Sequence, residues 1–215
     1  MTSKMTKDAY ENPDVVEGYI KSNALKPKLF ELIENFSKTI KGKKVLDLGC
    51  GPGHDTYKFS ELGFDVVGLD YSSEMIKRAK SLKDIENKPE FIVGDMRDIK
   101  DLFQEDSFDA AWVSASILHI IEKDVPKVLE GLKKILKEGA VCYIGLKGGI
   151  QGAVIVKDDK YGKEIQREFI FWERENFERL LEKFNFEIKE VTDTQQGKTG
   201  GYPTNWLNFF LLNHK

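Results

Sequence analysis

Asp47-Leu48-Gly49-Cys50-Gly51-Pro52-Gly53 is the stretch of this chain that decides its fold. It follows a short apolar strand candidate, Val45-Leu46, and precedes a helical pattern that begins near Asp55. Glycines lack the Cβ that blocks close approach to the main chain, and they adopt dihedral angles that other residues avoid. The helix that follows directs its free N–H groups toward the turn. The stretch therefore predicts a site for a nucleoside-bearing cofactor at the end of a strand.

Length and charge limit the classes of protein to which the chain can belong. It has 215 residues, of which 40% are hydrophobic and 32% are charged, and its formal net charge is -3. This length fits one domain over residues 1–215, and the charge gives no reason to expect a nucleic acid or an anionic membrane as a partner. Residues 1–7 lack the apolar core of a signal peptide, and no stretch approaches the roughly 20 apolar residues that span a bilayer. We therefore expect a cytoplasmic protein.

Cysteine and histidine form no metal-binding pattern in the sequence. The two cysteines, Cys50 in the glycine-rich turn and Cys142 in an apolar strand candidate, make neither a disulfide framework nor a ligand cluster. The three histidines have no ligand spacing. We expect reduced cysteines and no metal ion.

Apolar runs rich in β-branched residues alternate with amphipathic helical stretches from Val45 onward, which is typical of a parallel sheet with helices on both faces. A glycine-containing loop at residues 194–204 joins the last two strand candidates, and it is too short for a crossover helix, so these strands should run antiparallel. The sequence thus predicts a doubly wound α/β fold with a seven-stranded, mostly parallel sheet and an antiparallel last strand. The strand candidates are residues 44–48, 65–69, 90–93, 108–113, 140–146, 186–191 and 205–212.

Two glycine-containing regions have a predicted structural role. Gly139 follows the helical pattern of residues 125–136 and is expected to cap that helix at its C-terminus. Residues 148–172 have three glycines near their start and then two extended stretches around a polar turn. They predict a hairpin inserted into the main alternation.

Carboxylates at the next two strand ends decide between the many sites that use a glycine-rich turn. Asp70 follows the second strand candidate, where a carboxylate can accept two hydrogen bonds from a ribose diol. Asp95 and Met96 follow the third, where an acid beside an apolar side chain suits an adenine ring. Either aspartate alone could be a helix N-cap or a turn residue. Together, at successive carboxyl ends of one sheet, they favour a cofactor site.

These motifs resemble those of the class I S-adenosylmethionine-dependent methyltransferases, and the resemblance runs from Tyr10 to the last strand. Residues 47–53 are similar to the family's acidic, glycine-rich signature. Val66-Val67-Gly68-Leu69-Asp70-Tyr71-Ser72 looks like its ribose-binding segment, and Phe91-Ile92-Val93-Gly94-Asp95-Met96 looks like its adenine segment. Phe108-Asp109-Ala110-Ala111-Trp112-Val113 is similar to its fourth strand.

The resemblance implies a set of contacts with the methionine end of S-adenosylmethionine. Gly49 and Gly51 would approach the methionine part, and Asp47 would help to hold that end. Cys50 lies in the same turn and belongs to the expected cofactor site. The main chain around Ser114 would take the cofactor's amino group.

The resemblance also implies contacts with the nucleoside. Asp70 would bind the ribose, with Tyr71 beside it in the same segment. Asp95 with Met96 would bind the adenine ring.

Two other functions stay open beside methyl transfer. A nicotinamide dinucleotide site uses the spacing G-x-G-x-x-G to seat a pyrophosphate on a helix N-terminus. Here His54 replaces the third glycine and Asp55 would repel a pyrophosphate, so an NAD-dependent oxidoreductase is the less favoured alternative. The other is a sensor or inactive subunit that binds S-adenosylmethionine without catalysis. An exposed apolar patch in place of an acceptor cavity would favour it.

The sequence indicates a small-molecule methyl acceptor. Methyltransferases of exocyclic DNA amines or amide nitrogens usually carry Asn or Asp before Pro-Pro and an aromatic residue after the fourth strand, where this chain has Ser114-Ala115-Ser116-Ile117. No Pro-Cys pair for attack on a cytosine carbon occurs there, and the near-neutral charge disfavours nucleic acid. The acceptor atom and the oligomeric state stay open.

His119 is the candidate catalytic residue. It follows the fourth strand candidate in Leu118-His119, a position similar to the family's frequent Leu-His near the cofactor sulfonium. A histidine there could act as a general base at neutral pH. The alternative is a histidine that packs or hydrogen-bonds on the cofactor without proton transfer.

Five side chains are candidate substrate contacts. Tyr10 and Tyr19 lie in residues 1–40, which in relatives of this size fold over the methionine end as a helical lid. Arg167 and Phe169 in the hairpin and Tyr202 in the late loop could line an acceptor pocket, where an arginine beside aromatic rings suits a carboxylate-bearing or planar acceptor. The alternatives are ordinary packing for the aromatic residues and solvation for the arginine.

Overall fold

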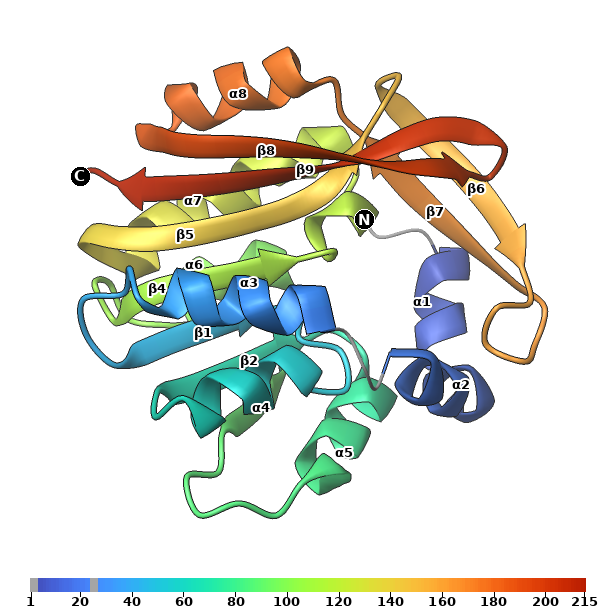
Figure 1. Cartoon of the computed structure of the whole chain (residues 1–215), viewed down its shortest axis with the longest axis horizontal. Coiled ribbons are helices and arrows are strands. Elements are labelled where there is room, and N and C mark those ends of the chain that lie inside the picture. The colour runs from blue at the N-terminus through green and yellow to red at the C-terminus, as the bar shows by residue number, and fades with distance from the viewer. Residues whose placement is uncertain (1–3, 24–26) are drawn as a thin grey trace.

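The computed structural model describes residues 4–23 and 27–215, apart from the side chains of Gln195 and Gln196. The strands of its main sheet are β1 (Lys44–Leu48), β2 (Asp65–Asp70), β3 (Glu90–Val93), β4 (Phe108–Ser114), β5 (Leu136–Gly148), β8 (Phe186–Thr199) and β9 (Tyr202–Asn213). Their order in the sheet is β3-β2-β1-β4-β5-β9-β8 (Figure 1). β1 to β5 run parallel, and β9 lies antiparallel between β5 and β8. The predicted doubly wound α/β fold with an antiparallel last strand is confirmed.

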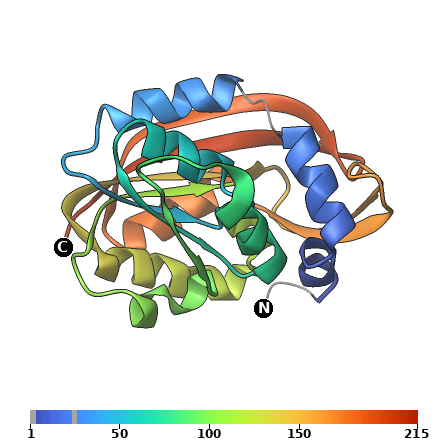
Figure 2. The same cartoon turned by 90° about the horizontal axis from the view of Figure 1, so that it is seen from below.

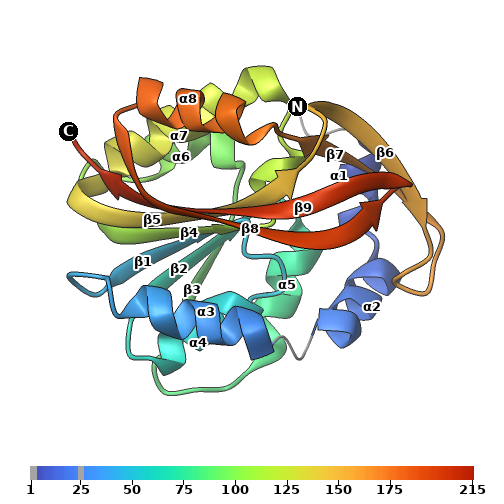
Figure 3. The same cartoon turned by 45° about the horizontal axis from the view of Figure 1, so that its top comes forward.

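Helices cover both faces of this sheet, as Figures 2 and 3 show. On one face, Ile33 and Phe36 pack with the strand residues Trp112 and Tyr143. On the other face, helical apolar residues such as Leu129 and Phe177 join the larger core. The helices are α1 (Lys4–Tyr10), α2 (Pro13–Asn23), α3 (Pro27–Ser37), α4 (His54–Glu61), α5 (Ser73–Leu82), α6 (Ile99–Leu102), α7 (Val125–Ile135) and α8 (Arg174–Lys183). Within residues 4–23 and 27–215, no helix is long and apolar enough to cross a membrane.

The first two helices, α1 and α2, and a separate hairpin gather beyond the carboxyl ends of the parallel strands (Figure 1). The hairpin consists of β6 (Gly152–Asp158) and β7 (Ile165–Phe171), which pair antiparallel outside the main sheet. It lies within the predicted residues 148–172, and a bridge between Gly148 and Trp172 adjoins its base. α1 is attached to it, because the Glu168 N–H donates to the Thr6 hydroxyl at 2.7 Å. Both elements therefore stand at the sheet edge where the sequence predicts the cofactor. Residues 1–3 and 24–26 of the predicted lid lie outside the described residues.

The predicted loop at residues 194–204 is wrong. β8 and β9 stay paired until Thr199 lies opposite Tyr202. Only Gly200 and Gly201 form the turn, with φ angles of 58° and 86°, as a tight two-residue hairpin turn requires. Gly197, at a φ of 95°, lies at a register shift typical of a β-bulge. These glycines shape a long hairpin and do not interrupt it.

The predicted helix cap at Gly139 is also wrong. α7 ends at Ile135, and Leu136 already pairs with Phe108 in the sheet. Gly139 has a φ of 71° and lies in β5, where the register with β4 shifts. Its left-handed conformation therefore serves a strand irregularity and not a helix end.

Candidate active site

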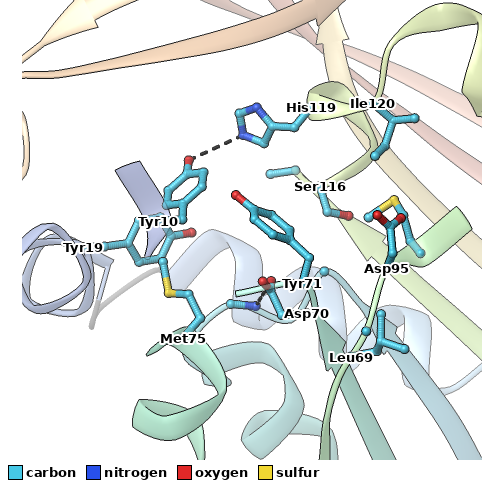
Figure 4. A pocket seen from close by; sticks show the side chains of 15 residues that line it. Tyr10, Tyr19, Leu69, Asp70, Tyr71, Met75, Asp95, Ser116, His119 and Ile120 are labelled. Atoms are coloured by element: carbon cyan, nitrogen blue, oxygen red, sulfur yellow. Dashed lines mark hydrogen bonds between the residues drawn. The ribbon is translucent and has the colours of Figure 1, made fainter. Parts of the chain in front are cut away.

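Three consecutive strand ends and the N-terminal helices surround one cavity (Figure 4). Most of the residues that the sequence assigns to the cofactor site line this cavity. Its wall includes Gly49 and Gly51 after β1, Asp70 and Tyr71 at β2, Asp95 and Met96 after β3, Tyr10 and Tyr19 from α1 and α2, and Ser116 and His119 after β4.

The glycine-rich turn is shaped by two different constraints. Gly49 has a φ of 81°, and a Cβ there would lie 2.2 Å from the Ser116 Cβ, so no side chain fits. Ser116 also donates to the Leu48 carbonyl at 2.6 Å, which holds the segment after β4 against the turn. Gly51 has a φ of 53°, and a Cβ there would meet no atom within 4 Å. The main chain at Gly51 is therefore open to a ligand.

Asp70 is a buried carboxylate held by main-chain donors. Its two oxygens accept the N–H groups of Gly51 and Ser72, each at 2.9 Å. Burial raises the pKa of Asp70 from 3.8 to about 6, and the hydrogen bonds from Ser72 and Gly51 limit the rise. Each oxygen of an ionised carboxylate can accept a further hydrogen bond. Asp70 can therefore bind two hydroxyl groups.

Asp95 is held by an ion pair that the sequence analysis did not predict. Arg97 donates its main-chain N–H at 3.0 Å and its Nε–H at 2.8 Å to one carboxylate oxygen, and an Nη2–H to the other. Arg97 also pairs with Asp124 at 3.2 Å. Burial opposes ionisation of Asp95, but the hydrogen bonds from Arg97 outweigh it and lower its pKa. A carboxylate neutralised in this way suits a neutral amine better than a cation.

His119 has both ring nitrogens engaged. Its Nδ1 lies 2.8 Å from the carbonyl oxygen of Glu168, so this nitrogen must carry the proton. The Tyr10 hydroxyl, 3.4 Å from Nε2, is then the donor to that nitrogen (Figure 4). Burial lowers the pKa of His119 to about 4, which keeps the ring neutral at pH 7. The Tyr10 hydroxyl in turn accepts from Arg167 Nη1 at 3.2 Å.

The end of α1 is attached to the start of α5. The Tyr10 carbonyl accepts the Ser72 hydroxyl at 2.7 Å. The Glu11 carboxylate accepts from the main-chain N–H and the hydroxyl of Ser73, each at 3.0 Å. A carboxylate at these free N–H groups stabilises the helix start. α1 is thereby held over the side of the cavity where Asp70 lies.

A few predicted cofactor residues do not line this cavity. Asp47 is buried behind the turn and accepts the Thr56 hydroxyl at 2.5 Å, and burial raises its pKa well above the usual range. Cys50 packs into an apolar cluster with Tyr57. Ser114 lines a separate cavity between α3 and β9.

The sequence analysis missed several residues of the wall. Leu69 and Gly94 each precede a predicted aspartate, so their position beside it in the chain could have indicated them. Met75, Ser116 and Ile120 carry no such signal, because tertiary packing alone brings them to the wall. Among the described residues, no group of three or more His, Cys, Asp or Glu residues is placed to hold a metal ion.

A second cavity, of 450 Å³, adjoins the first. The two share Tyr10, Tyr19, Ala115 and His119 in their walls. Arg167 and Phe169 line the second cavity from β7. Tyr202 lines neither of the two, and 53% of its surface is exposed at the start of β9. The structure thus separates Tyr202 from the other candidate substrate contacts.

A family model described as a methyltransferase domain matches residues 40–199, from just before β1 to the end of β8. The chain belongs to the class I S-adenosylmethionine-dependent methyltransferases. S-adenosylmethionine is therefore the cofactor of this chain.

This chain has relatives that differ in length and in name. It is 35% identical over 104 residues to demethylmenaquinone methyltransferase of Paenarthrobacter aurescens, a match that covers 48% of the chain and 38% of the relative. It is 27% identical over 203 residues to the human mitochondrial ubiquinone biosynthesis O-methyltransferase, which covers 88% of the chain and 54% of the relative. The chain thus spans about half the length of these curated relatives, or less.

The fold of this chain also matches solved structures. An S-adenosylmethionine-dependent methyltransferase from Methanosarcina mazei superposes with a TM-score of 0.72 at 20% identity, covering 88% of this chain and 98% of that one. At this identity the likeness supports the fold alone.

Proposed function

We propose that this protein transfers the methyl group of S-adenosylmethionine to a small-molecule acceptor. The observation that carries the proposal is the cavity at the ends of β1, β2 and β3, where an open glycine turn, a buried carboxylate and an acid beside a methionine meet. The cofactor, when bound, supplies a methyl group activated by a sulfonium. The protein then has to align the acceptor and keep water out. The second cavity, with its shared wall, gives an acceptor a place next to the cofactor cavity.

The residues of the first cavity suit each part of this cofactor. We assign the ribose diol to Asp70, because its oxygens keep acceptor capacity beyond the two main-chain donors. We assign the adenine to Asp95 and Met96. Arg97 balances the charge of the Asp95 carboxylate, which can still accept a hydrogen bond beside the apolar side chain of Met96. Tyr71 completes the ribose side.

The methionine end belongs, in this proposal, to the turn and the residues behind it. The main chain at Gly49 and Gly51 would contact that end. Asp47 and Cys50 would support the turn from behind, because both are buried. The main chain near Ser114 would take the amino group, next to Ala115 on the cavity wall.

His119 has two candidate roles in this proposal. A pKa of about 4 makes it a weak base, and both nitrogens are already bonded, to Glu168 and to Tyr10. We therefore favour a positioning role, in which neutral His119 holds Tyr10 between the two cavities. His119→Ala separates the roles. Loss of turnover with unchanged S-adenosylhomocysteine affinity would support the base, whereas equal loss in both would support positioning.

Within residues 1–40, we further propose that α1 and α2 act as a lid, whereas α3 packs on the face of the sheet. We also propose that residues 1–215 form one domain. The bonds from Ser72 and Ser73 to α1 and Glu11 support the lid, because they hold α1 over the first cavity. Opening of these bonds would let the cofactor enter. A cytoplasmic location and the absence of a nucleic-acid or membrane partner stay predictions from the sequence, and the oligomeric state stays open.

The alternatives are separated by titration calorimetry with S-adenosylmethionine, S-adenosylhomocysteine and NAD. Micromolar binding of the first two alone is expected. Binding of NAD alone would reverse the assignment to an oxidoreductase. The non-catalytic alternative predicts cofactor binding without methylation of any acceptor in a screen that follows release of S-adenosylhomocysteine. The second cavity favours the enzyme, because a sensor needs no such space beside its ligand.

A further inference from the structure

The second cavity has an excess of positive charge. Its wall includes Lys147, Lys160, Arg167 and Lys198 but, among the described residues, only one carboxylate, Asp158. Asp158 pairs with Arg167, with its Oδ2 at 2.5 Å from Nη2. The chain as a whole carries a formal net charge of -3, so this excess is local and not a property of the composition. A cationic cavity concentrates anionic ligands.

Two of these cationic side chains are buried, although Lys and Arg side chains are usually exposed. Arg167 is 6% exposed and Lys147 is 8% exposed. Arg167 uses Nη1 for Tyr10 and Tyr161, and Nη2 for Asp158. Its Nε is buried without a hydrogen-bond partner in the described part of the chain. An unpaired buried donor is costly, so a movement of Arg167 that brings this N–H to the acceptor of a ligand would be favourable.

Lys147 reaches the same cavity from β5. Its Nζ lies 4.5 Å from the centre of the Trp206 ring. Burial, with a smaller effect from the charge of Lys160, lowers the pKa of Lys147 to about 8. An ammonium group that has lost part of its hydration gains most from a nearby anion. Lys147 and Arg167 thus place two buried cations in the wall of this cavity, which suits an anionic ligand.

Several aromatic rings also line this cavity. Tyr10 and Tyr19 stand where the two cavities meet, and Tyr161, Phe169 and Trp206 surround the cations. Arg167 lies 5.0 Å from the ring centre of Tyr161 and 5.3 Å from that of Phe169. Flat rings of this kind pack well against a planar ligand.

We propose that the methyl acceptor is a planar compound that carries a carboxylate, and that Lys147 and Arg167 bind this carboxylate. The proposal rests on the proposed function, since it takes the second cavity as the acceptor site. A carboxylate fits better than a phosphate monoester, because Asp158 already balances the charge of Arg167, and a carboxylate brings one negative charge where a phosphate monoester brings up to two. The planar part would then lie along the aromatic wall toward Tyr10 and His119, where the cofactor cavity begins.

The test compares matched pairs of small aromatic probes in the presence of saturating S-adenosylhomocysteine. Benzoate is paired with benzamide and cinnamate with cinnamamide, and phenyl phosphate is added as a third charge type. Binding is measured by calorimetry and by the fluorescence change of Trp206, whose contribution is identified with Trp206→Phe. We expect each carboxylate to bind about tenfold or more tightly than its amide, as charge-assisted hydrogen bonds in a buried site provide.

Two lysine variants make the comparison specific. Lys147→Gln should abolish most of the preference for the carboxylate. Lys157→Gln should keep it, because Lys157 pairs with Glu164 outside this cavity. Both should bind S-adenosylhomocysteine like the wild type, since neither residue lines the first cavity. Arg167→Lys, which keeps the charge, is the second test variant if Lys147→Gln does not fold.

Several outcomes would overturn the inference. They are equal binding within each pair, no carboxylate binding up to about 10 mM, or a preference that survives both Lys147→Gln and Arg167→Lys. Tighter binding of phenyl phosphate than of benzoate would refute the carboxylate and assign a phosphate monoester. Failure of the wild type to bind S-adenosylhomocysteine would instead refute the proposed function, so the two failures are distinguishable.

Discussion

Replacing Asp70 by Asn should weaken cofactor binding and leave the free protein about as stable as before. Asp70 is 8% exposed, and burial raises its pKa from 3.8 to about 6. Each pKa unit corresponds to about 1.4 kcal/mol, so the ionised carboxylate lowers the free energy of unfolding by roughly 3 kcal/mol at pH 7. Asn removes this charge. Its amide group, however, would face one of the N–H groups of Gly51 and Ser72, which costs about 1 to 3 kcal/mol.

The sign of the pH dependence follows from the raised pKa. The folded protein binds the Asp70 proton more tightly than the unfolded chain does. The stability that Asp70 contributes is therefore fully present below pH 3.8 and is lost as the pH rises through 6. Asp70→Asn lacks this titration. We expect the stability of the wild type relative to the variant to increase as the pH falls from about 6 to about 4.

Binding should respond in the opposite direction. If ionised Asp70 accepts the ribose hydroxyls, Asp70→Asn loses about 1.5 to 3 kcal/mol, or about ten- to a hundredfold in S-adenosylhomocysteine affinity at pH 7.5. With a pKa of about 6, protonation of Asp70 should weaken wild-type binding about tenfold at pH 5. The variant should not show this loss. Calorimetry across this pH range, with denaturant melts at each pH, measures both effects.

Asp109→Asn is the matched control. Asp109 accepts the main-chain N–H groups of Lys43 and Lys44, each at 2.9 Å, and pairs with Lys137 at 2.6 Å. Burial opposes its ionisation, but these hydrogen bonds outweigh it and lower its pKa, so Asp109→Asn should destabilise the protein without changing cofactor affinity. Wild-type affinity in Asp70→Asn, or a stability loss as large as that of Asp109→Asn, would refute the reasoning about Asp70.

Further predictions concern the turn, the histidine and the lid. Gly49→Ala should prevent folding or lower the melting temperature steeply, because the added Cβ would lie 2.2 Å from the Ser116 Cβ. In Gly51→Ala the added Cβ meets no atom within 4 Å, so the positive φ alone should lower the free energy of unfolding, by about 1 to 2 kcal/mol in melts. The His119 ring should titrate near pH 4 by NMR, and a midpoint above pH 6 would contradict the buried, neutral ring. The stability that the neutral ring contributes should be fully present above the ordinary pKa of 6.5 and lost as the pH falls through 4. Glu11→Ala should speed amide exchange in residues 4–10 while the exchange of β1 stays unchanged, and equal protection in both proteins would mean that Glu11 does not hold α1.

The parallel strands were predictable because their signal is local. β1 and β3 have the bounds that the sequence predicts, residues 44–48 and 90–93. β1 and β4 are buried on both faces between helices, so burial produces a continuous apolar run within a few residues. The acids at the ends of β2 and β3 follow such runs directly. The grouping of these acids around one cavity could therefore be predicted from neighbours in the chain.

The full length of the hairpin formed by β8 and β9 was not predictable in the same way. β8 and β9 extend to Thr199 and Tyr202, far beyond the apolar residues that predicted them. Their outer parts are polar and largely exposed, so main-chain pairing between distant residues maintains the strands where no apolar pattern does. The glycines at Gly200 and Gly201 carried a hairpin signal, because two residues of positive φ make a tight turn. The surrounding polar residues favoured a loop and concealed it.

The acceptor side of the site depends entirely on residues that are distant in the chain. The His119 ring accepts from the Tyr10 hydroxyl and donates to the Glu168 carbonyl, and Arg167, the neighbour of Glu168 on β7, also reaches Tyr10. Lys147, on β5, appears in the sequence as one more solvated charge. Only the fold brings it into one buried wall with Arg167. Sequence motifs thus suggest the cofactor, and Arg167 as a contact for a carboxylate, whereas the proposed role of Lys147 depends on the convergence of elements that are distant in the chain.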